Sequence, residues 1–287
     1  MSIGLLWTDK TENEDFSFFN NYRSAFKNYF KTPINEVDSV DKISQYNKLI
    51  IVDEHDRAHK KLICDPRFVE TINRQNINVV IFNTEKIFNS YWIHNLETQK
   101  NIEKINNCLQ ILSDVKDIKR SGTPFKNKQY LSKELNFKKE NIKKNNKILF
   151  FGQLDGKAYK NRRKIIDKIS NSIDISLDVF KSTRSMSYKE YMNLLSKYRF
   201  VLNPLGAGEF VNVRFYEALK VGATPIQQMT PRMKSYYDFE IGENISINFH
   251  RPNMLQSINF KNFEFKPLNF YLEDYFFQNN LISLFKL

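Results

Sequence analysis

The residues best suited to chemistry lie in the stretch "NPLGAGEFVNVRFYEALKVGATP", at positions 203–225. This stretch places two glutamates, Glu209 and Glu217, eight positions apart. Gly206 and Gly208 come just before a helical pattern, where glycine permits positive φ angles and a close approach of the backbone to a ligand. The N-terminus of a helix offers free N–H groups and a partial positive charge. The stretch is therefore suited to binding a diphosphate.

Two interpretations of these acids are open. Eight residues of ideal helix leave two side chains about 80° apart around the helix axis. The spacing therefore makes sense if Glu209 lies in the loop and Glu217 on the helix, each contacting a different part of one extended ligand. Alternatively, Arg214 and Glu217 form an ordinary i,i+3 ion pair and Glu209 is a solvated loop acid.

The stretch belongs to a longer alternation of short apolar runs and amphipathic segments, which extends from residue 2 to about residue 228. Such alternation is typical of βαβ units and parallel sheets, so the sequence predicts an α/β fold. Strands are expected at 2–7, 48–53, 77–83, 108–113, 147–152, 174–180, 199–204 and 223–227. Helices are expected at 15–30, 160–169 and 211–220, and after the capping box Ser187-x-x-Glu190.

A Lys-rich segment without aliphatic periodicity, "LNFKKENIKKNNK" at 135–147, is the best candidate for an interdomain linker. It predicts two Rossmann-like domains, 1–140 and 141–287. Two such domains place the carboxyl ends of their strands around one cleft, where ligands bind in open sheets. The last helical segment, 268–287, could cross back to the first domain.

With these features, the second half resembles glycosyltransferases of the GT-B fold, especially the retaining group-1 and exostosin-like C-terminal domains. In that family a glycine-rich loop is followed by Glu-x7-Glu, then by Ala and by a later Gly and Pro. The corresponding residues here are Glu209, Glu217, Ala218, Gly222 and Pro225. The stretches "FFGQLDGKAYKNRR" (150–163) and "SMSYKEYMNLLSKYRFVLNPLG" (185–206) resemble the elements that precede the motif. The resemblance covers 147–227 and is weak in the first half.

The resemblance implies transfer of a sugar from a nucleotide-diphosphate sugar to an acceptor hydroxyl, with retention of configuration. It implies that Glu217 hydrogen-bonds the ribose hydroxyls of the donor and that Glu209 lies beside the transferred sugar as a catalytic participant. The backbone of Gly208 and Phe210 would run along the hydroxyls of that sugar. Gly152, in the strand and loop that open the domain, belongs to the same expected donor site.

A leaving diphosphate carries two or more negative charges, which basic side chains and a helix N-terminus stabilise. The candidates for this role are Lys157, Arg162, Arg163, Arg184 and Arg214. Arg163 adjoins Arg162, so we expect at least one of the two to point outward. The sequence contains no Asp-x-Asp motif, which agrees with a metal-independent site that needs no cofactor besides the donor.

The acceptor side is expected in the first half, where "IIVDEHDRAHKK" (50–61) continues an apolar strand into titratable residues. His55 or Asp56 could orient or deprotonate an acceptor hydroxyl. Alternatively, this is a polar strand end with a helix cap.

The acceptor itself is open. It is either a glycan or protein, or a hydroxymethylated base in DNA as in phage base glucosyltransferases. The formal net charge of +12 favours DNA, but the abundance of Lys, Asn and Ile also fits an AT-biased genome. A candidate from another class is a non-catalytic sugar-nucleotide or nucleic-acid binding protein on the same scaffold.

Two further observations indicate the compartment. Cys64 and Cys108 match neither a disulfide framework nor a zinc pattern, which fits a reducing environment. No apolar stretch approaches the roughly 20 residues that span a bilayer, and the N-terminal "MSIGLLWTDKTENED" lacks the basic region of a signal peptide. We expect a cytoplasmic protein, in the host cytoplasm if the source is a virus.

Overall fold

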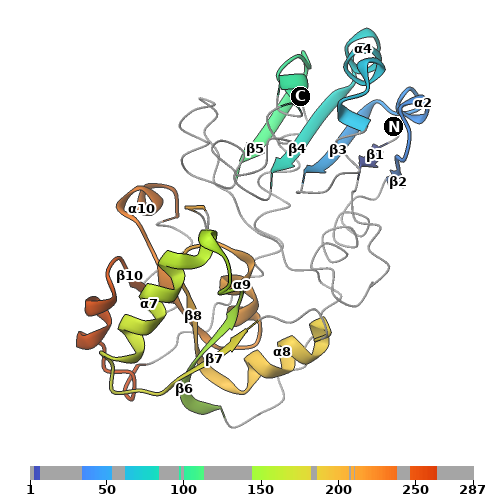
Figure 1. The fold of residues 1–287 in the computed structure, drawn as a ribbon. Coiled ribbons are helices and arrows are strands. Elements are labelled where there is room, and N and C mark those ends of the chain that lie inside the picture. The colour runs from blue at the N-terminus through green and yellow to red at the C-terminus, as the bar shows by residue number, and fades with distance from the viewer. Residues whose placement is uncertain are drawn as a thin grey trace. The chain divides into compact units, whose positions relative to one another are not determined.

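The computed structural model describes residues 3–6, 34–53, 62–83, 97, 100–112, 144–181, 186–206, 208–209, 211–237 and 246–263. The chain divides into two compact units, and each contains a five-stranded parallel sheet with helices packed on it (Figure 1). This confirms the predicted α/β class. The predicted domain boundary at 140 and the predicted helices at 15–30 and in 268–287 lie outside the described residues. No helix in the described part of the chain is long and apolar enough to cross a membrane.

The first unit contains a sheet in the order β2-β1-β3-β4-β5. Its strands are β1 (Ile3–Leu6), β2 (Ile34–Glu36), β3 (Lys48–Asp53), β4 (Asn78–Asn83) and β5 (Cys108–Leu112). Two helices pack on it, α2 (Val40–Ile43) and α4 (Pro66–Arg74). Four of these strands match the predicted ones to within a residue at each end. The strand β2 was not predicted, because three residues are too few to show an alternating pattern.

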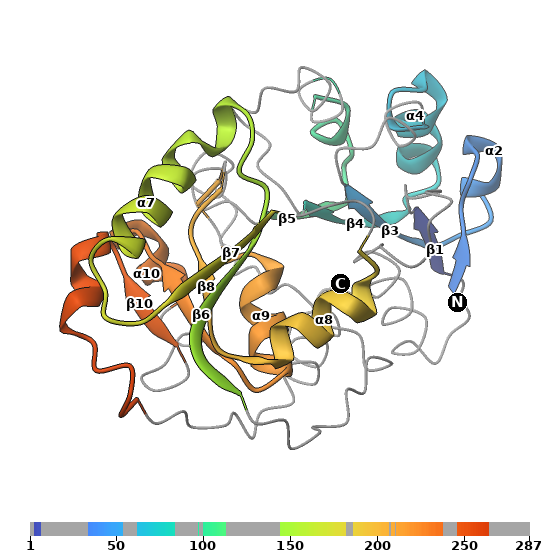
Figure 2. The ribbon, with the colours of Figure 1, turned by 60° about the horizontal axis from the view of Figure 1, so that its bottom comes forward.

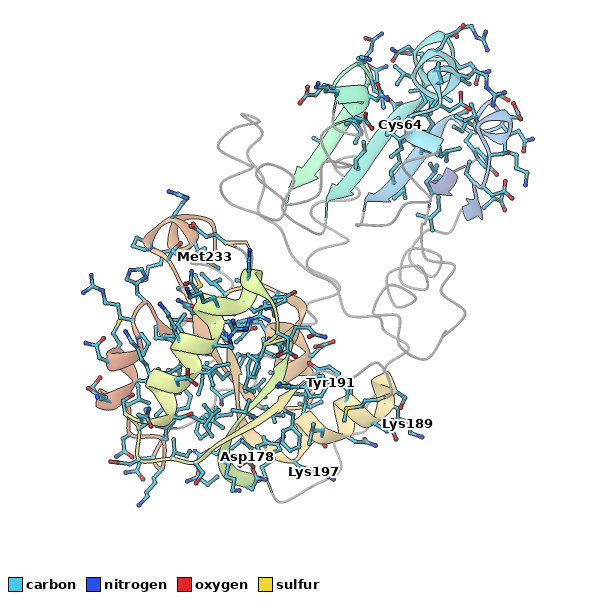
Figure 3. All side chains as sticks on the ribbon, in the orientation of Figure 1. Cys64, Asp178, Lys189, Tyr191, Lys197 and Met233 are labelled. Carbon is cyan, nitrogen blue, oxygen red and sulfur yellow. The ribbon has the colours of Figure 1, made fainter. Side chains whose placement is uncertain are left out.

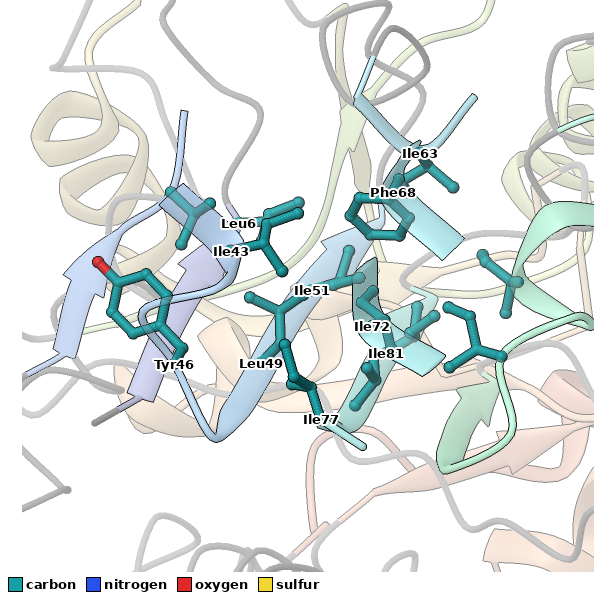
Figure 4. Packing of buried hydrophobic residues seen from close by; sticks show 14 of the residues in the cluster. Leu6, Ile43, Tyr46, Leu49, Ile51, Ile63, Phe68, Ile72, Ile77 and Ile81 are labelled. Carbon is teal, nitrogen blue, oxygen red and sulfur yellow. The ribbon is translucent and has the colours of Figure 1, made fainter. Parts of the chain in front are cut away.

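The core of the first unit lies between the sheet and these two helices (Figure 4). Alternate residues of the strands, such as Leu49 and Ile51 of β3, pack against Phe68 of α4. Ile50, which points to the opposite face, is also fully buried. A sheet that is buried on both faces has near-continuous apolar strands, as parallel sheets do.

The second unit contains a sheet in the order β10-β9-β8-β6-β7. Its strands are β6 (Asn145–Gly152), β7 (Leu177–Lys181), β8 (Tyr198–Asn203), β9 (Thr224–Gln228) and β10 (Ile247–Phe249). Its helices are α7 (Lys160–Ser170), α8 (Tyr188–Ser196), α9 (Val213–Lys220) and α10 (Pro231–Tyr237), with 3-10 turns η2 (Lys157–Tyr159) and η3 (Pro252–Ser257). The strand β6 starts inside the predicted linker, and β7 starts three residues later than predicted.

Helices cover both faces of this second sheet (Figure 2). Ile148 and Phe150 of β6 face α7 and η3, whereas Leu149 and Phe151 face α8 and α9. The helix α8 begins with the predicted capping box, in which the Ser187 side chain accepts from the Glu190 backbone N–H and the Glu190 carboxylate accepts from the Ser187 backbone N–H. The capping box therefore fixes the start of α8 locally.

The helix α9 also has its start and end fixed by local contacts. The Asn212 side chain caps its N-terminus by accepting a hydrogen bond from the backbone N–H of Arg214. At the other end, Gly222 adopts a φ of 69°, and the next residue, Ala223, donates its N–H to the carbonyl of Ala218 at 2.8 Å. This is the Schellman arrangement that glycine favours. Gly222 therefore turns the chain into β9.

The two sheets have the same strand order. In each sheet, the first strand in sequence lies between the second and the third, and the fourth and fifth follow the third. The chain therefore changes direction across the sheet between β6 and β8 in the second unit, and between β1 and β3 in the first. Ligands of open α/β sheets bind at this switch point, beyond the carboxyl ends of the strands. In the second unit, the loops at this point are 153–156 and 204–212.

Candidate functional site

Arg162 lies in the first turn of α7 and points into the switch point of the second unit. Only 7% of it is exposed. Its Nη1 donates to the carbonyl oxygen of Gln153 at 3.0 Å, and its Cζ lies 4.7 Å from the centroid of the Tyr159 ring. Its neighbour Arg163 instead donates to the carbonyls of Leu154 and Gly156. Of the neighbouring residues Arg162 and Arg163, Arg162 is therefore the buried one.

Arg214 approaches the same point from the first turn of α9. Its Nη1 donates to Asn203 Oδ1 at 3.2 Å, and its Cζ lies 5.3 Å from the centroid of the Phe150 ring. The Nε atoms of both Arg162 and Arg214 are buried, and neither has a hydrogen-bond partner in the described part of the chain. Buried donors of this kind are rare in folded proteins unless a ligand or water completes them.

Gly152 and Gly206 make room for the two guanidinium groups. A Cβ at Gly206 would lie 2.5 Å from Nη2 of Arg162, and one at Gly152 would lie 2.6 Å from Nη2 of Arg214. Gly206 does not use the positive φ that glycine permits, because the positive-φ glycines of the described chain are Gly152, Gly156 and Gly222. Gly206 is required for the space that it leaves beside Arg162, and its backbone angles do not call for glycine.

The two arginines bring two positive charges close together. Burial, and then the nearby charge of Arg214, lower the pKa of Arg162 to about 10. Among the residues that the structure describes, neither guanidinium forms a salt bridge with a carboxylate. Neither α7 nor α9 has an acidic residue in its first turn, where the helix dipole favours negative charge. The arrangement is therefore one that a bound anion would complete.

Glu217 lies inside α9, one turn beyond Arg214, and only 3% of it is exposed. Its Oε2 accepts a hydrogen bond of 2.7 Å from the hydroxyl of Tyr191. Tyr191 belongs to α8 and is buried against the sheet (Figure 3). Burial, together with the charge of Glu217, raises the pKa of Tyr191 well above its usual value, so the hydroxyl keeps its proton and donates.

Glu209 precedes Asn212, the N-cap of α9, which confirms that the two glutamates are divided between loop and helix. Its Oε2 accepts from Thr230 Oγ1 at 3.3 Å and from Arg232 Nη1 at 3.2 Å. Its side chain is 18% exposed. Glu209 is therefore anchored to the loop before α10 and to α10 itself, and the interpretation as a solvated loop acid is wrong.

Sequence reasoning missed a buried polar chain behind Arg214. Asn203, the last residue of β8, donates from Nδ2 to the Oε1 of Gln227 on β9. Gln227 in turn donates to the carbonyl oxygen of Gln228 at 2.7 Å. Asn203 and Gln227 are both at most 1% exposed. The available signal was a polar residue at the end of each apolar strand, in "RFVLN" and "TPIQQ".

The remaining predicted residues fall into two groups. Gly208 is buried in the loop before α9, and Lys157 is exposed in η2 beside the same switch point. His55, Asp56, Arg184 and Phe210 lie outside the described residues. Within the described ranges, no group of three or more His, Cys, Asp or Glu residues could hold a metal ion.

Comparisons with known proteins were made for the sequence and for the structure. No protein-family model and no curated protein sequence matches the chain. Similar solved structures include an α1,3-fucosyltransferase, at 12% identity and a TM-score of 0.43, covering 99% of this chain and 80% of the other. UDP-GlcNAc 2-epimerase from Methanocaldococcus jannaschii matches at 10% identity and a TM-score of 0.43, covering 94% of each chain. The glycosyltransferase SnogD from Streptomyces nogalater matches at 8% identity and a TM-score of 0.34, covering 88% and 87%. Values this low establish neither a shared family nor a shared activity.

Proposed function

We propose that this chain is a glycosyltransferase of the GT-B fold, which moves a sugar from a nucleotide-diphosphate sugar to an acceptor hydroxyl. The observation that carries the proposal is the pair of arginines with buried Nε atoms at the switch point of the second sheet. Arg162 and Arg214 have orphaned N–H donors and no carboxylate partner in the described part of the chain. A diphosphate supplies the missing acceptors and the missing negative charge at once.

The chemistry of transfer needs such a site. Breaking the bond between the sugar and the diphosphate leaves negative charge on the departing oxygen, and cationic groups already in place stabilise that charge in the transition state. Because two guanidinium groups and two helix N-termini supply the positive charge, we propose that the reaction needs no divalent metal. Full activity in the presence of EDTA would support this, and activity that returns only when a divalent metal is added would contradict it.

The two glutamates take different roles in this proposal. Glu217, on the same helix as Arg214, hydrogen-bonds the ribose hydroxyls of the donor. Glu209 lies beside the transferred sugar, and the reaction retains the configuration at the anomeric carbon. These roles follow from the match to the Glu-x7-Glu motif. His55 or Asp56 is proposed to orient the acceptor hydroxyl.

The proposal is tested with a panel of UDP- and GDP-sugars, in which release of the nucleoside diphosphate is measured. One donor should be consumed. Glu217→Gln should weaken binding of that nucleotide, and Glu209→Gln should lower turnover with little change in nucleotide binding. Glu70→Gln is the matched control, because Glu70 is an exposed acid of the first unit. Unchanged binding and turnover in both site variants would contradict the assignment.

Two acceptors remain proposals, and one measurement separates them. A DNA acceptor predicts an affinity for duplex DNA that falls steeply as salt is raised, because Lys and Arg release counterions from phosphates. No measurable affinity at about 50 mM salt would favour a glycan or protein acceptor.

The second candidate function is a non-catalytic sugar-nucleotide binding protein. The contacts of Glu209 favour it, since a carboxylate held by Thr230 and Arg232 is already engaged. Tight binding of one nucleotide sugar without release of nucleoside diphosphate, in the presence of glycan, protein and DNA acceptors, would support this alternative.

A further inference from the structure

We propose that Tyr191 is a positioning residue that keeps Arg214 and Glu217 from pairing with each other. It thereby leaves the guanidinium of Arg214 for the anionic part of a ligand. This inference rests on the proposed function, since it concerns the same site. It adds a residue that the Glu-x7-Glu motif does not contain.

The need for such a residue follows from the spacing on α9. Arg214 and Glu217 are three positions apart, and side chains at this spacing are neighbours on a helix surface. An oppositely charged pair there normally forms a direct ion pair, and the attraction grows where water is excluded. A direct ion pair would neutralise the cation that an anionic ligand needs and occupy the acceptor oxygens of the acid.

The described structure shows a different arrangement. The Glu217 carboxylate accepts from the Tyr191 hydroxyl at 2.7 Å, and the Arg214 guanidinium donates to Asn203. Arg214 acts on the same Tyr191 hydroxyl, where its charge opposes the rise in the pKa of Tyr191 that burial and Glu217 produce. One neutral hydroxyl therefore lies in contact with the acid and faces the cation.

Contacts with two neighbouring elements define the position of Tyr191. It follows the capping box of α8, in which Ser187 and Glu190 fix the first turn. Its ring packs against Phe151 of β6, with centroids 4.9 Å apart. Tyr191 comes from α8 and not from α9, so contacts outside α9 hold it.

The test measures binding of inorganic pyrophosphate to the full chain by calorimetry, so it needs no knowledge of the sugar. Tyr191→Phe keeps the ring and removes only the hydroxyl. We expect Arg214 and Glu217 to pair in this variant and pyrophosphate affinity to fall roughly tenfold. The control is Tyr198→Phe, because Tyr198 likewise donates its hydroxyl to a carboxylate, that of Asp178, in the same unit. It should bind pyrophosphate like the unchanged chain.

A second variant distinguishes positioning from a general structural role. In Glu217→Gln the competing charge is absent, so adding Tyr191→Phe to it should change pyrophosphate affinity by less than about twofold. If Tyr191→Phe leaves affinity unchanged, or lowers it as much in the Glu217→Gln background as alone, the inference is wrong. Thermal melts of every variant identify a loss that comes from unfolding.

The outcome is separable from that of the proposed function. If no nucleotide sugar is consumed but the pyrophosphate pattern holds, the positioning role of Tyr191 stands and the transferase proposal fails. If a sugar is transferred and Tyr191→Phe binds pyrophosphate normally, the positioning role fails and the transferase proposal stands.

Discussion

Replacing Arg162 by Met should make the protein more stable and less able to bind an anion. The pKa of Arg162 is lowered to about 10, more than two units below its ordinary value, because the charge is buried and lies near Arg214. Each pKa unit corresponds to about 1.4 kcal/mol, so keeping this charge in the folded protein costs about 3 kcal/mol. The folded pKa is the lower one, so this cost is fully present below about pH 10 and is relieved as the pH rises above that value.

The substitution also removes favourable contacts, which reduces the gain. The hydrogen bond to the Gln153 carbonyl contributes about 1 kcal/mol, and the contact with the Tyr159 ring contributes roughly 0.5–1 kcal/mol. Met fills a similar volume and has no charge. The net expectation for Arg162→Met is a gain of about 1–2 kcal/mol in the free energy of unfolding, or a rise of roughly 3–8 °C in Tm.

Thermal melts with and without pyrophosphate provide the assay. Without ligand, Arg162→Met should melt above the unchanged protein. With pyrophosphate at 100 times the Kd of the unchanged protein, that protein gains about 2.7 kcal/mol and should become the more stable of the two. Arg163→Met is the matched control, because Arg163 caps carbonyls of the adjoining loop and should leave pyrophosphate binding nearly unchanged. A less stable Arg162→Met that binds pyrophosphate normally would refute the assignment of this cluster as an anion site.

Three further predictions concern the second unit. Gly206→Ala should displace the Arg162 guanidinium, since the new Cβ would lie 2.5 Å from its Nη2. Calorimetry should then show that pyrophosphate binds roughly fivefold more weakly, while Tm changes by less than about 2 °C. A normal pyrophosphate affinity would contradict this prediction. Lys144→Met should lower the free energy of unfolding in urea by about 2 kcal/mol, because this half-buried ammonium donates to backbone carbonyls at the ends of α8 and α9. The exposed Lys147→Met is its control and should stay within about 0.5 kcal/mol. Ser187→Ala removes the cap of α8 and should lower the free energy of unfolding by about 1 kcal/mol in the same urea titration. An unchanged free energy of unfolding would mean that the cap contributes nothing to stability.

Much of the local structure of the second unit is encoded in short stretches of sequence. The boundaries of α9 follow from Asn212 at its start and Gly222 at its end, and the start of α8 follows from its capping box. The division of Glu209 and Glu217 between loop and helix follows from the same signals. All of these depend on contacts within a few residues, which a sequence displays directly.

Short and irregular elements were not predictable in this way. The strand β2 has three residues, and β10 also has three, so neither shows a period. The strand β7 starts later than predicted because residues 174–176 have the alternating pattern of a strand but do not pair with β6. Pairing with β6 begins only at Leu177. Pairing with a neighbouring strand, which is a tertiary contact, decided where this element begins.

The sequence by itself determined the α/β class, most of the strands and the helix that carries Glu217, because these depend on periodicity and on capping over short distances. Only the tertiary structure decided which arginine of the adjacent pair is buried, since this depends on the order of β6 and β8 in the sheet. The same holds for the contact between Tyr191 and Glu217, which joins two helices across 26 positions of sequence. Side chains from separate elements meet only when the sheet brings them together, and no pattern within either element records that meeting.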